Sequence, residues 1–136
     1  MGILIGEGIK NALHVRDPIS NQVLTLYFRI PTPEERAGYV VAQFERTGKE
    51  VKLRATEARQ EYGLKILEGF EEGTFEKTDG DGKRVPAFSS DQGSPAYVTN
   101  WKELALKHGA HLIEYLAVYV FDGTRAVSEQ EYISKN

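Results

Sequence analysis

The segment that most constrains the fold is Thr32-Pro33-Glu34-Glu35, which carries the residue types of a helix start in the right order. A threonine side chain can accept a hydrogen bond from the first turn, and proline suits the first helical position. A glutamate three residues after the cap completes a capping box. Two carboxylates in the first turn also suit the positive end of the helix dipole. A helix is therefore predicted to begin at this point.

The residues after this start repeat at helical spacing. Apolar positions at i, i+3, i+4 and i+7 predict one buried helix face. The face consists of Ala37, Val40, Val41 and Phe44. Gly48 is the type of residue that ends a helix. A second helix is predicted over residues 51–68, and the short connection at Gly48 favours an antiparallel pair of helices.

Two strands are predicted before the capping box. Residues 11–16 alternate in polarity, and residues 23–30 are rich in β-branched and aromatic side chains. Because residues 17–22 are turn-forming types, the two strands are predicted to form a hairpin. An isolated hairpin is marginally stable in water and leaves two open edges. Helices or another chain must cover it, which favours oligomerisation or the addition of a partner's strand.

The second half of the chain begins with a long polar segment, residues 71–95, which is rich in glycine and proline. It is predicted to be a long loop, with a brief strand over residues 85–88. Within it, Asp79-Gly-Asp-Gly82 resembles the middle of a calcium loop. Placing Gly82 at the sixth position of an EF-hand puts Lys77 first and Phe88 twelfth, where carboxylates are needed. A solvated turn is therefore favoured.

Residues 99–121 are predicted to form a long helix, with Thr99 or Asn100 as its cap and Gly109 as a kink. Three large aromatic residues belong to this segment, and the apolar periodicity around them favours core packing over an aromatic binding face. These residues are Trp101, Tyr115 and Tyr119.

These elements predict a single α+β domain over residues 1–136 that is mostly helical, with an N-terminal β-hairpin, two antiparallel helices and a long C-terminal helix. A length of 136 residues suits one domain. Residues 1–10 are expected to form a loose N-terminus and residues 122–136 a polar tail.

The composition excludes several classes of protein. The chain has no cysteine, which excludes disulfides, thiolate zinc sites and cysteine nucleophiles and suits the cytoplasm. The net charge is −3 with no basic block, so no nucleic-acid partner is expected. No run approaches the roughly 18 apolar residues of a membrane span, so no membrane partner is expected.

His108, His111 and Glu114 recur at intervals of three and would share one helix face, an arrangement that suits a metal ion. The spacing differs from H-E-x-x-H and Gly109 interrupts the helix, so polar packing positions are favoured. A small metal-dependent enzyme that uses these residues is one alternative. No nucleophile elbow or phosphate loop occurs, so no catalytic, cofactor-binding or metal site is predicted.

Several segments resemble small prophage-encoded proteins. Phe28-Arg-Ile-Pro-Thr-Pro-Glu-Glu-Arg36 is similar to their passage from strand to helix. Further similar segments are Ser89-Ser-Asp91, Ser94-Pro-Ala-Tyr97, Asn100-Trp-Lys-Glu-Leu104 and the apolar helix up to Val120-Phe121. Over residues 23–121 the pattern resembles the tail assembly chaperones of long-tailed phages.

The resemblance implies a non-enzymatic phage or prophage accessory protein in the cytoplasm of the host cell. Such chaperones bind the elongated tape-measure protein and keep it soluble until tail tube protein surrounds it. A tape-measure-like protein is therefore the expected partner, and the resemblance assigns no binding residue. The alternative within phage biology is a structural virion component, such as a connector or tail-completion protein.

Overall fold

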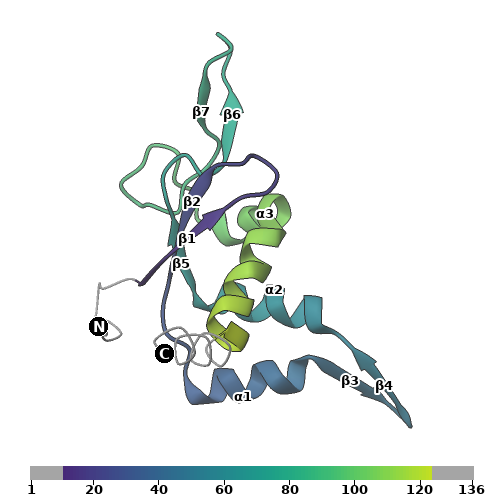
Figure 1. The fold of residues 1–136 in the computed structure, drawn as a ribbon. Coiled ribbons are helices and arrows are strands. Elements are labelled where there is room, and N and C mark those ends of the chain that lie inside the picture. Colours follow the sequence, from purple (N-terminus) through teal and green to yellow (C-terminus); the bar gives the residue numbers. More distant parts are fainter. Residues whose placement is uncertain (1–10, 124–136) are drawn as a thin grey trace, which may run out of the picture.

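The computed structural model describes residues 11–123, which contain three antiparallel sheets and three α-helices (Figure 1). The helices are α1 (Pro33–Ala42), α2 (Ala55–Ile66) and α3 (Trp101–Ala117), and α3 continues into a π-helical turn, η1 (Val118–Asp122). The expected α+β class is confirmed. The expectation of a mostly helical chain is wrong, because helices take up fewer than half of the described residues.

The largest sheet has the strand order β1-β2-β5. β1 (Asn11–Arg16) and β2 (Val23–Phe28) pair antiparallel, with Asn11 opposite Phe28, so the predicted N-terminal hairpin is confirmed. β5 (Leu67–Phe70) adds to the other edge of β2. Because side chains alternate along a strand, one face of the β1–β2 hairpin collects five buried apolar residues. These residues are Leu13, Val15, Leu24, Leu26 and Phe28.

This apolar face belongs to the core of the molecule, together with residues of α2, β5 and α3. The largest fully buried aliphatic side chains of these helices are Ile66, Ile113 and Leu116. Full burial of each such side chain stabilises the fold by about 1.5–3 kcal/mol. The sheet and the two helices therefore hold one another in place.

The predicted capping box is present. Thr32 Oγ1 accepts from the Glu35 backbone N–H at 3.1 Å, and Glu35 Oε1 accepts from the Thr32 N–H at 2.9 Å. The guanidinium of Arg29 donates two further hydrogen bonds to Glu35, both 2.7 Å. These bonds from Arg29 lower the pKa of Glu35 to about 2. The end of β2 is thereby tied to the start of α1.

The prediction for the residues after this start is wrong. α1 ends at Ala42, and β3 (Phe44–Thr47) and β4 (Glu50–Leu53) follow as a hairpin. Gly48 has φ of +63° and lies in the two-residue turn between the strands, as in a type II′ turn, and so does not end a helix. The second helix consequently begins at Ala55, not at residue 51. Figure 1 shows α1 and α2 running in opposite directions, with the hairpin between them.

The predicted apolar face of α1 is also wrong, since Val40, Val41 and Phe44 are all more than half exposed. The helix is anchored through Tyr39, which is 2 % exposed. The Tyr39 ring stacks on Phe121 with centroids 4.6 Å apart, and its hydroxyl donates to Asp122 Oδ2 at 2.6 Å. Burial first, and then the Asp122 carboxylate, raise the pKa of Tyr39 to about 12.

The long helix and its kink are confirmed. Asn100 precedes α3 without a side-chain capping bond, and Gly109 departs from helical geometry, with φ −139° and ψ 39°. The ring of Phe75 packs closely here, because a Cβ added at Gly109 would lie 2.8 Å from its Cζ. A side chain at residue 109 would displace Phe75, so close packing explains why a glycine occupies this position.

Residues 71–95 are more ordered than the predicted long loop. β6 (Glu76–Thr78) and β7 (Arg84–Pro86) form a hairpin that projects from the body (Figure 1). Asp79 Oδ1 accepts from the N–H groups of Asp81 and Lys83 at 2.8 and 2.9 Å, so the calcium-like stretch is a turn, as the sequence favours. The brief strand predicted at 85–88 is confirmed for its first two residues. The predicted loose N-terminus, residues 1–10, and nearly all of the polar tail lie outside the described residues.

Candidate functional site

The β3–β4 hairpin, hereafter the arm (residues 44–53), is exposed along its whole length and points away from the three-stranded sheet (Figure 1). Its register gives the two faces different chemistry, because directly opposed residues share a face. One face carries the pairs Phe44–Leu53 and Arg46–Val51, and the other carries Glu45–Lys52 and Thr47–Glu50. The arm is therefore amphipathic, with one apolar face and one charged face.

Nothing in the described chain covers the apolar face of the arm. Phe44, Val51 and Leu53 are 51 %, 52 % and 77 % exposed. Arg46 lies among them and makes no side-chain hydrogen bond or ion pair with residues 11–123. At the base of the arm, Arg54 pairs with Glu45 at 3.0 Å.

The arm is basic as well as apolar. Residues 44 to 54 include four cationic side chains and two carboxylates. The cations are Arg46, Lys49, Lys52 and Arg54, and the carboxylates are Glu45 and Glu50.

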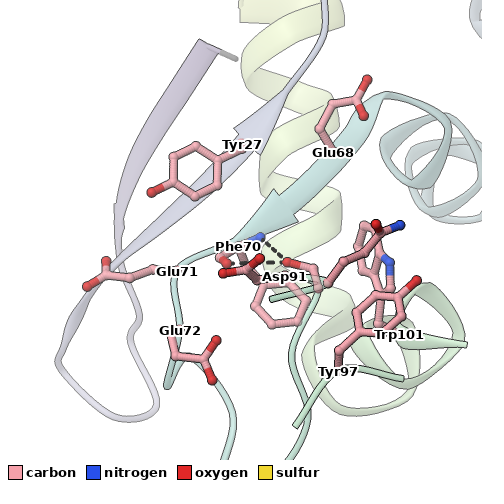
Figure 2. A pocket seen from close by; sticks show the side chains of 10 residues that line it. Tyr27, Glu68, Phe70, Glu71, Glu72, Asp91, Tyr97 and Trp101 are labelled. Atoms are coloured by element: carbon pink, nitrogen blue, oxygen red, sulfur yellow. Dashed lines mark hydrogen bonds between the residues drawn. The ribbon is translucent and has the colours of Figure 1, made fainter. Parts of the chain in front are cut away.

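A second feature is an open cavity of about 610 Å³ beside β5, hereafter the hollow (Figure 2). Its walls combine aromatic rings with carboxylates, and no Lys, Arg or His of residues 11–123 lines it. The rings are Tyr27, Phe70, Tyr97 and Trp101, and the carboxylates are Glu68, Glu71, Glu72 and Asp91. In Figure 2 the three glutamates come from β5 and the residues just after it, while Asp91, Tyr97 and Trp101 come from later in the chain.

The segment that closes the hollow is held to β5 by specific bonds. Ser90 Oγ accepts from the Phe70 N–H at 3.0 Å, which covers part of the open edge of β5. Glu72 accepts from the hydroxyls of Ser89 and Ser94 at 2.6 and 2.8 Å. The Phe70 ring meets Trp101 edge to face with centroids 5.7 Å apart. The segment that closes the hollow is therefore held in place by hydrogen bonds and a ring contact and is not a loose surface loop.

The carboxylates of the hollow differ in the hydrogen bonds and ion pairs that they already make within the chain. Glu72 has its two serine partners, and Asp91 accepts from the Gly93 N–H at 2.9 Å. Glu68 Oε1 lies 3.9 Å from Arg29 Nε, and the charge of Glu68 also acts on the ammonium of Lys102. The Glu71 side chain has no hydrogen bond or ion pair within the described residues. Glu71 therefore leaves negative charge at the rim for an incoming cation, and Glu68 can still gain a closer partner than Arg29.

A third feature spans the last turn of α3 and the start of η1. Tyr115, Val118 and Tyr119, hereafter the tyrosine stripe, share one helix face and are 51 %, 38 % and 43 % exposed. The predicted core packing is therefore wrong for both tyrosines. The Tyr119 ring still meets the Phe28 ring edge to face, with centroids 6.4 Å apart. The prediction is right for Trp101, which packs on Phe70. The stripe is an exposed apolar surface with two hydroxyls at its border.

The metal-ligand candidates do not converge. His111 Nε2 lies 2.8 Å from Asp17 Oδ1, whereas Glu114 Oε2 accepts from Gln60 Nε2 at 3.0 Å. The His108 ring faces Phe88, with centroids 6.2 Å apart. Among residues 11–123 no group of three or more His, Asp or Glu residues could hold a metal ion. The three residues are packing and pairing positions, as the spacing favours.

Asp17 is the carboxylate in this region with the strongest compensation. It is 7 % exposed and accepts from Ser20 Oγ at 2.7 Å, from the N–H groups of Ile19 and Ser20, and from His111. The hydroxyl bond from Ser20, followed by the His111 bond, lowers the pKa of Asp17 to about 2 despite burial. The turn of the N-terminal hairpin is thereby tied to α3.

No protein-family model, curated protein or solved structure matches the chain. In the part of the chain that the structure describes, no helix is long and apolar enough to cross a membrane.

Proposed function

We propose that this chain is a non-enzymatic accessory protein of a tailed phage or prophage, a tail assembly chaperone that acts in the host cytoplasm. Its partner is an elongated, tape-measure-like protein. The observation that carries the proposal is the tyrosine stripe, an apolar surface at positions i, i+3 and i+4 that begins at Tyr115 of α3 and continues into η1. The choice of a phage partner rests on the sequence resemblance over residues 23–121.

The spacing of the stripe suits a helical partner. Apolar side chains at i, i+3 and i+4 lie side by side, so they can pack against an apolar helix laid along the same direction. Tyrosine adds a large contact area with few rotatable bonds, and its hydroxyl stays in contact with water at the rim of an interface. A long tape-measure helix with its apolar face covered in this way stays soluble.

The proposal is tested by co-expressing the chain with the longest coiled-coil-like protein encoded beside it. We expect the partner to be insoluble alone and to co-purify in soluble form with this chain. Tyr115→Ser with Tyr119→Ser should abolish the co-purification, because it removes two of the three contact side chains. The matched control is Ile19→Ser with Val23→Ser, two apolar residues that are 79 % and 55 % exposed outside the stripe.

Two results would contradict this function. If the partner is soluble by itself and does not associate, the chain has no chaperone activity toward it. If the chain is retained in purified phage particles, it is a structural virion component, since an assembly chaperone leaves before the particle is complete.

A further inference from the structure

We propose that copies of this chain associate head to tail, with the arm of one copy docked in the hollow of the next. The occupant of the hollow is thus a second copy of the same chain. This inference concerns a surface other than the tyrosine stripe, and it goes beyond the binding of a tape-measure-like partner.

The first argument is the chemistry of the arm. Its uncovered face holds three apolar side chains around a single cation, Arg46, which has no partner in residues 11–123. A two-stranded hairpin is only marginally stable by itself in water. An apolar face that carries an unpaired arginine is suited to a site that supplies both apolar contact and carboxylates.

The second argument is that the hollow supplies both. An arginine guanidinium stacks on aromatic faces and forms paired hydrogen bonds with carboxylates. Tyr97 and Trp101 offer the rings. Glu71 offers a carboxylate with no side-chain partner in the described chain, and Glu68 offers one whose nearest ion pair is 3.9 Å long. A volume of about 610 Å³ falls within the range of sites that enclose a few side chains.

The third argument is charge complementarity within a chain that is acidic overall. The arm together with the adjoining Arg54 has two more cationic than acidic side chains, whereas the hollow has four carboxylates and no cation. Opposite potentials of this kind select the partner and accelerate its encounter. In Figure 1 the arm points away from β5, beside which the hollow lies, so the arm meets the hollow of another molecule rather than its own.

The geometry of such a contact is heterologous, because the two surfaces differ. Each copy then has one arm and one hollow to offer, so association continues to a closed ring or an open filament. An isologous dimer, in which two arms pack face to face, would stop at two copies. The two arrangements are therefore distinguished by their stoichiometry.

The test begins with sedimentation velocity of the whole chain over a range of concentrations. We expect the average mass to rise with protein concentration beyond that of a dimer, and to fall as salt is added because the contact is partly electrostatic. A chain that stays monomeric at the highest concentration attainable would overturn the proposal.

Two variants address the two surfaces. The arm variant is Arg46→Gln with Leu53→Ser, and the hollow variant is Glu68→Gln with Glu71→Gln. Each should weaken association by about tenfold or more, because it leaves charged partners unpaired. All four residues have exposed side chains or lie at the surface, and circular dichroism confirms that each variant is folded. If both variants associate like the unmodified chain, the proposal is wrong.

Matched controls make the same kinds of change elsewhere. Lys107→Gln with Ile19→Ser removes one exposed cation and one exposed apolar side chain, both outside the arm and the hollow. Glu61→Gln with Glu103→Gln removes two exposed carboxylates outside the hollow. Association should persist in both controls. Equal loss in controls and variants would show a general charge effect and overturn the specific contact.

The decisive experiment mixes the arm variant with the hollow variant. The first retains a hollow and the second retains an arm, so head-to-tail docking predicts a one-to-one dimer that does not grow further. Arm-to-arm packing predicts no mixed dimer, because the hollow variant would pair with itself through its intact arm and leave the arm variant monomeric, and that result would overturn the proposal. The tyrosine-stripe variant should associate normally, and the arm variant should still bind the tape-measure-like partner, so failure of either proposal is distinguishable from failure of the other.

Discussion

The β1–β2 hairpin and the arm have the same local structure and opposite surroundings. Both are antiparallel pairs with one apolar face. In β1–β2 that face belongs to the core with α2 and α3, and Leu26 is 2 % exposed. In the arm the equivalent face meets water, and Leu53 is 77 % exposed. The comparison shows that strand pairing alone does not decide whether an apolar face is covered, because the core covers the face of β1–β2 and no described residue covers that of the arm.

The turns of the two hairpins differ in the same way. In β1–β2 the turn is fixed by Asp17, which collects three bonds from its own loop and one from His111. In the arm the two-residue turn relies on the positive φ of Gly48, with no atoms within 4 Å of the site of its missing side chain. The turn of the β1–β2 hairpin is therefore bonded to the body of the molecule, whereas the arm is joined to the body only at its base.

The largest predicted difference between the hairpins is the cost of removing one leucine from each. Leu26→Ala should lower the free energy of unfolding by about 2–5 kcal/mol, because it leaves a cavity in the core. Leu53→Ala should change it by less than about 0.5 kcal/mol in the monomer. Urea unfolding at low protein concentration measures both. Equal losses would show that the arm packs on the body.

The next largest effect concerns the turn of the N-terminal hairpin. Asp17→Ala should cost about 1–3 kcal/mol, because it leaves the hydrogen-bond donors of the loop without their acceptor. The control is Asp81→Ala in the β6–β7 turn, where the neighbouring Asp79 accepts the turn's hydrogen bonds. A change at Asp17 no larger than the control would mean that the link to α3 does not stabilise the hairpin.

Lowering the pH should destabilise the β1–β2 hairpin and its link to α1, and no such effect is expected in the arm. The pKa values of Asp17 and Glu35 are lowered to about 2 from their usual values of 3.8 and 4.5. Stability from a lowered pKa is present above the usual value and is lost as pH falls through the folded value. Thermal unfolding should therefore shift to lower temperature between about pH 4.5 and pH 2. In Asp17→Asn with Glu35→Gln this dependence should be much reduced, and an unchanged slope would contradict the assignment.

The smallest predicted effect is Gly48→Ala at the tip of the arm. A residue with a Cβ at positive φ costs about 1 kcal/mol, and only within the arm. Amide hydrogen exchange in β3 and β4 should become faster, while the global midpoint of urea unfolding should stay the same. A clear shift in that midpoint would show that the arm and the body unfold together.

The sequence predicted the β1–β2 hairpin better than the arm, and the reason is physical. Residues 11–28 alternate because one face is buried, and burial is what makes a pattern visible. The capping box and the kink at Gly109 were also predicted, since both are local chemistry. The arm was read as helix because Val40, Val41 and Phe44 fall at helical spacing and Gly48 suits a helix end as well as a turn. The alternating residues on both sides of Gly48-Lys49 were the signal that could have identified a hairpin.

The candidate site could not be predicted from spacing. The hollow combines Tyr27 with residues 68–72, 90–92, 97 and 101, which only the strand order β1-β2-β5 and the bonds of Ser90 and Glu72 bring together. Likewise, the apolar periodicity of α3 does not show which side chains the sheet leaves uncovered. Tyr115 and Tyr119 therefore looked like core residues.

The most direct test of the central claim is amide hydrogen exchange measured at low and high protein concentration. The account predicts that protection in the arm rises with concentration, that protection of residues 68–72 and 90–97 rises with it, and that protection in β1 and β2 stays constant. Protection that rises in the arm alone, or in neither region, would contradict docking of the arm in the hollow of a second copy.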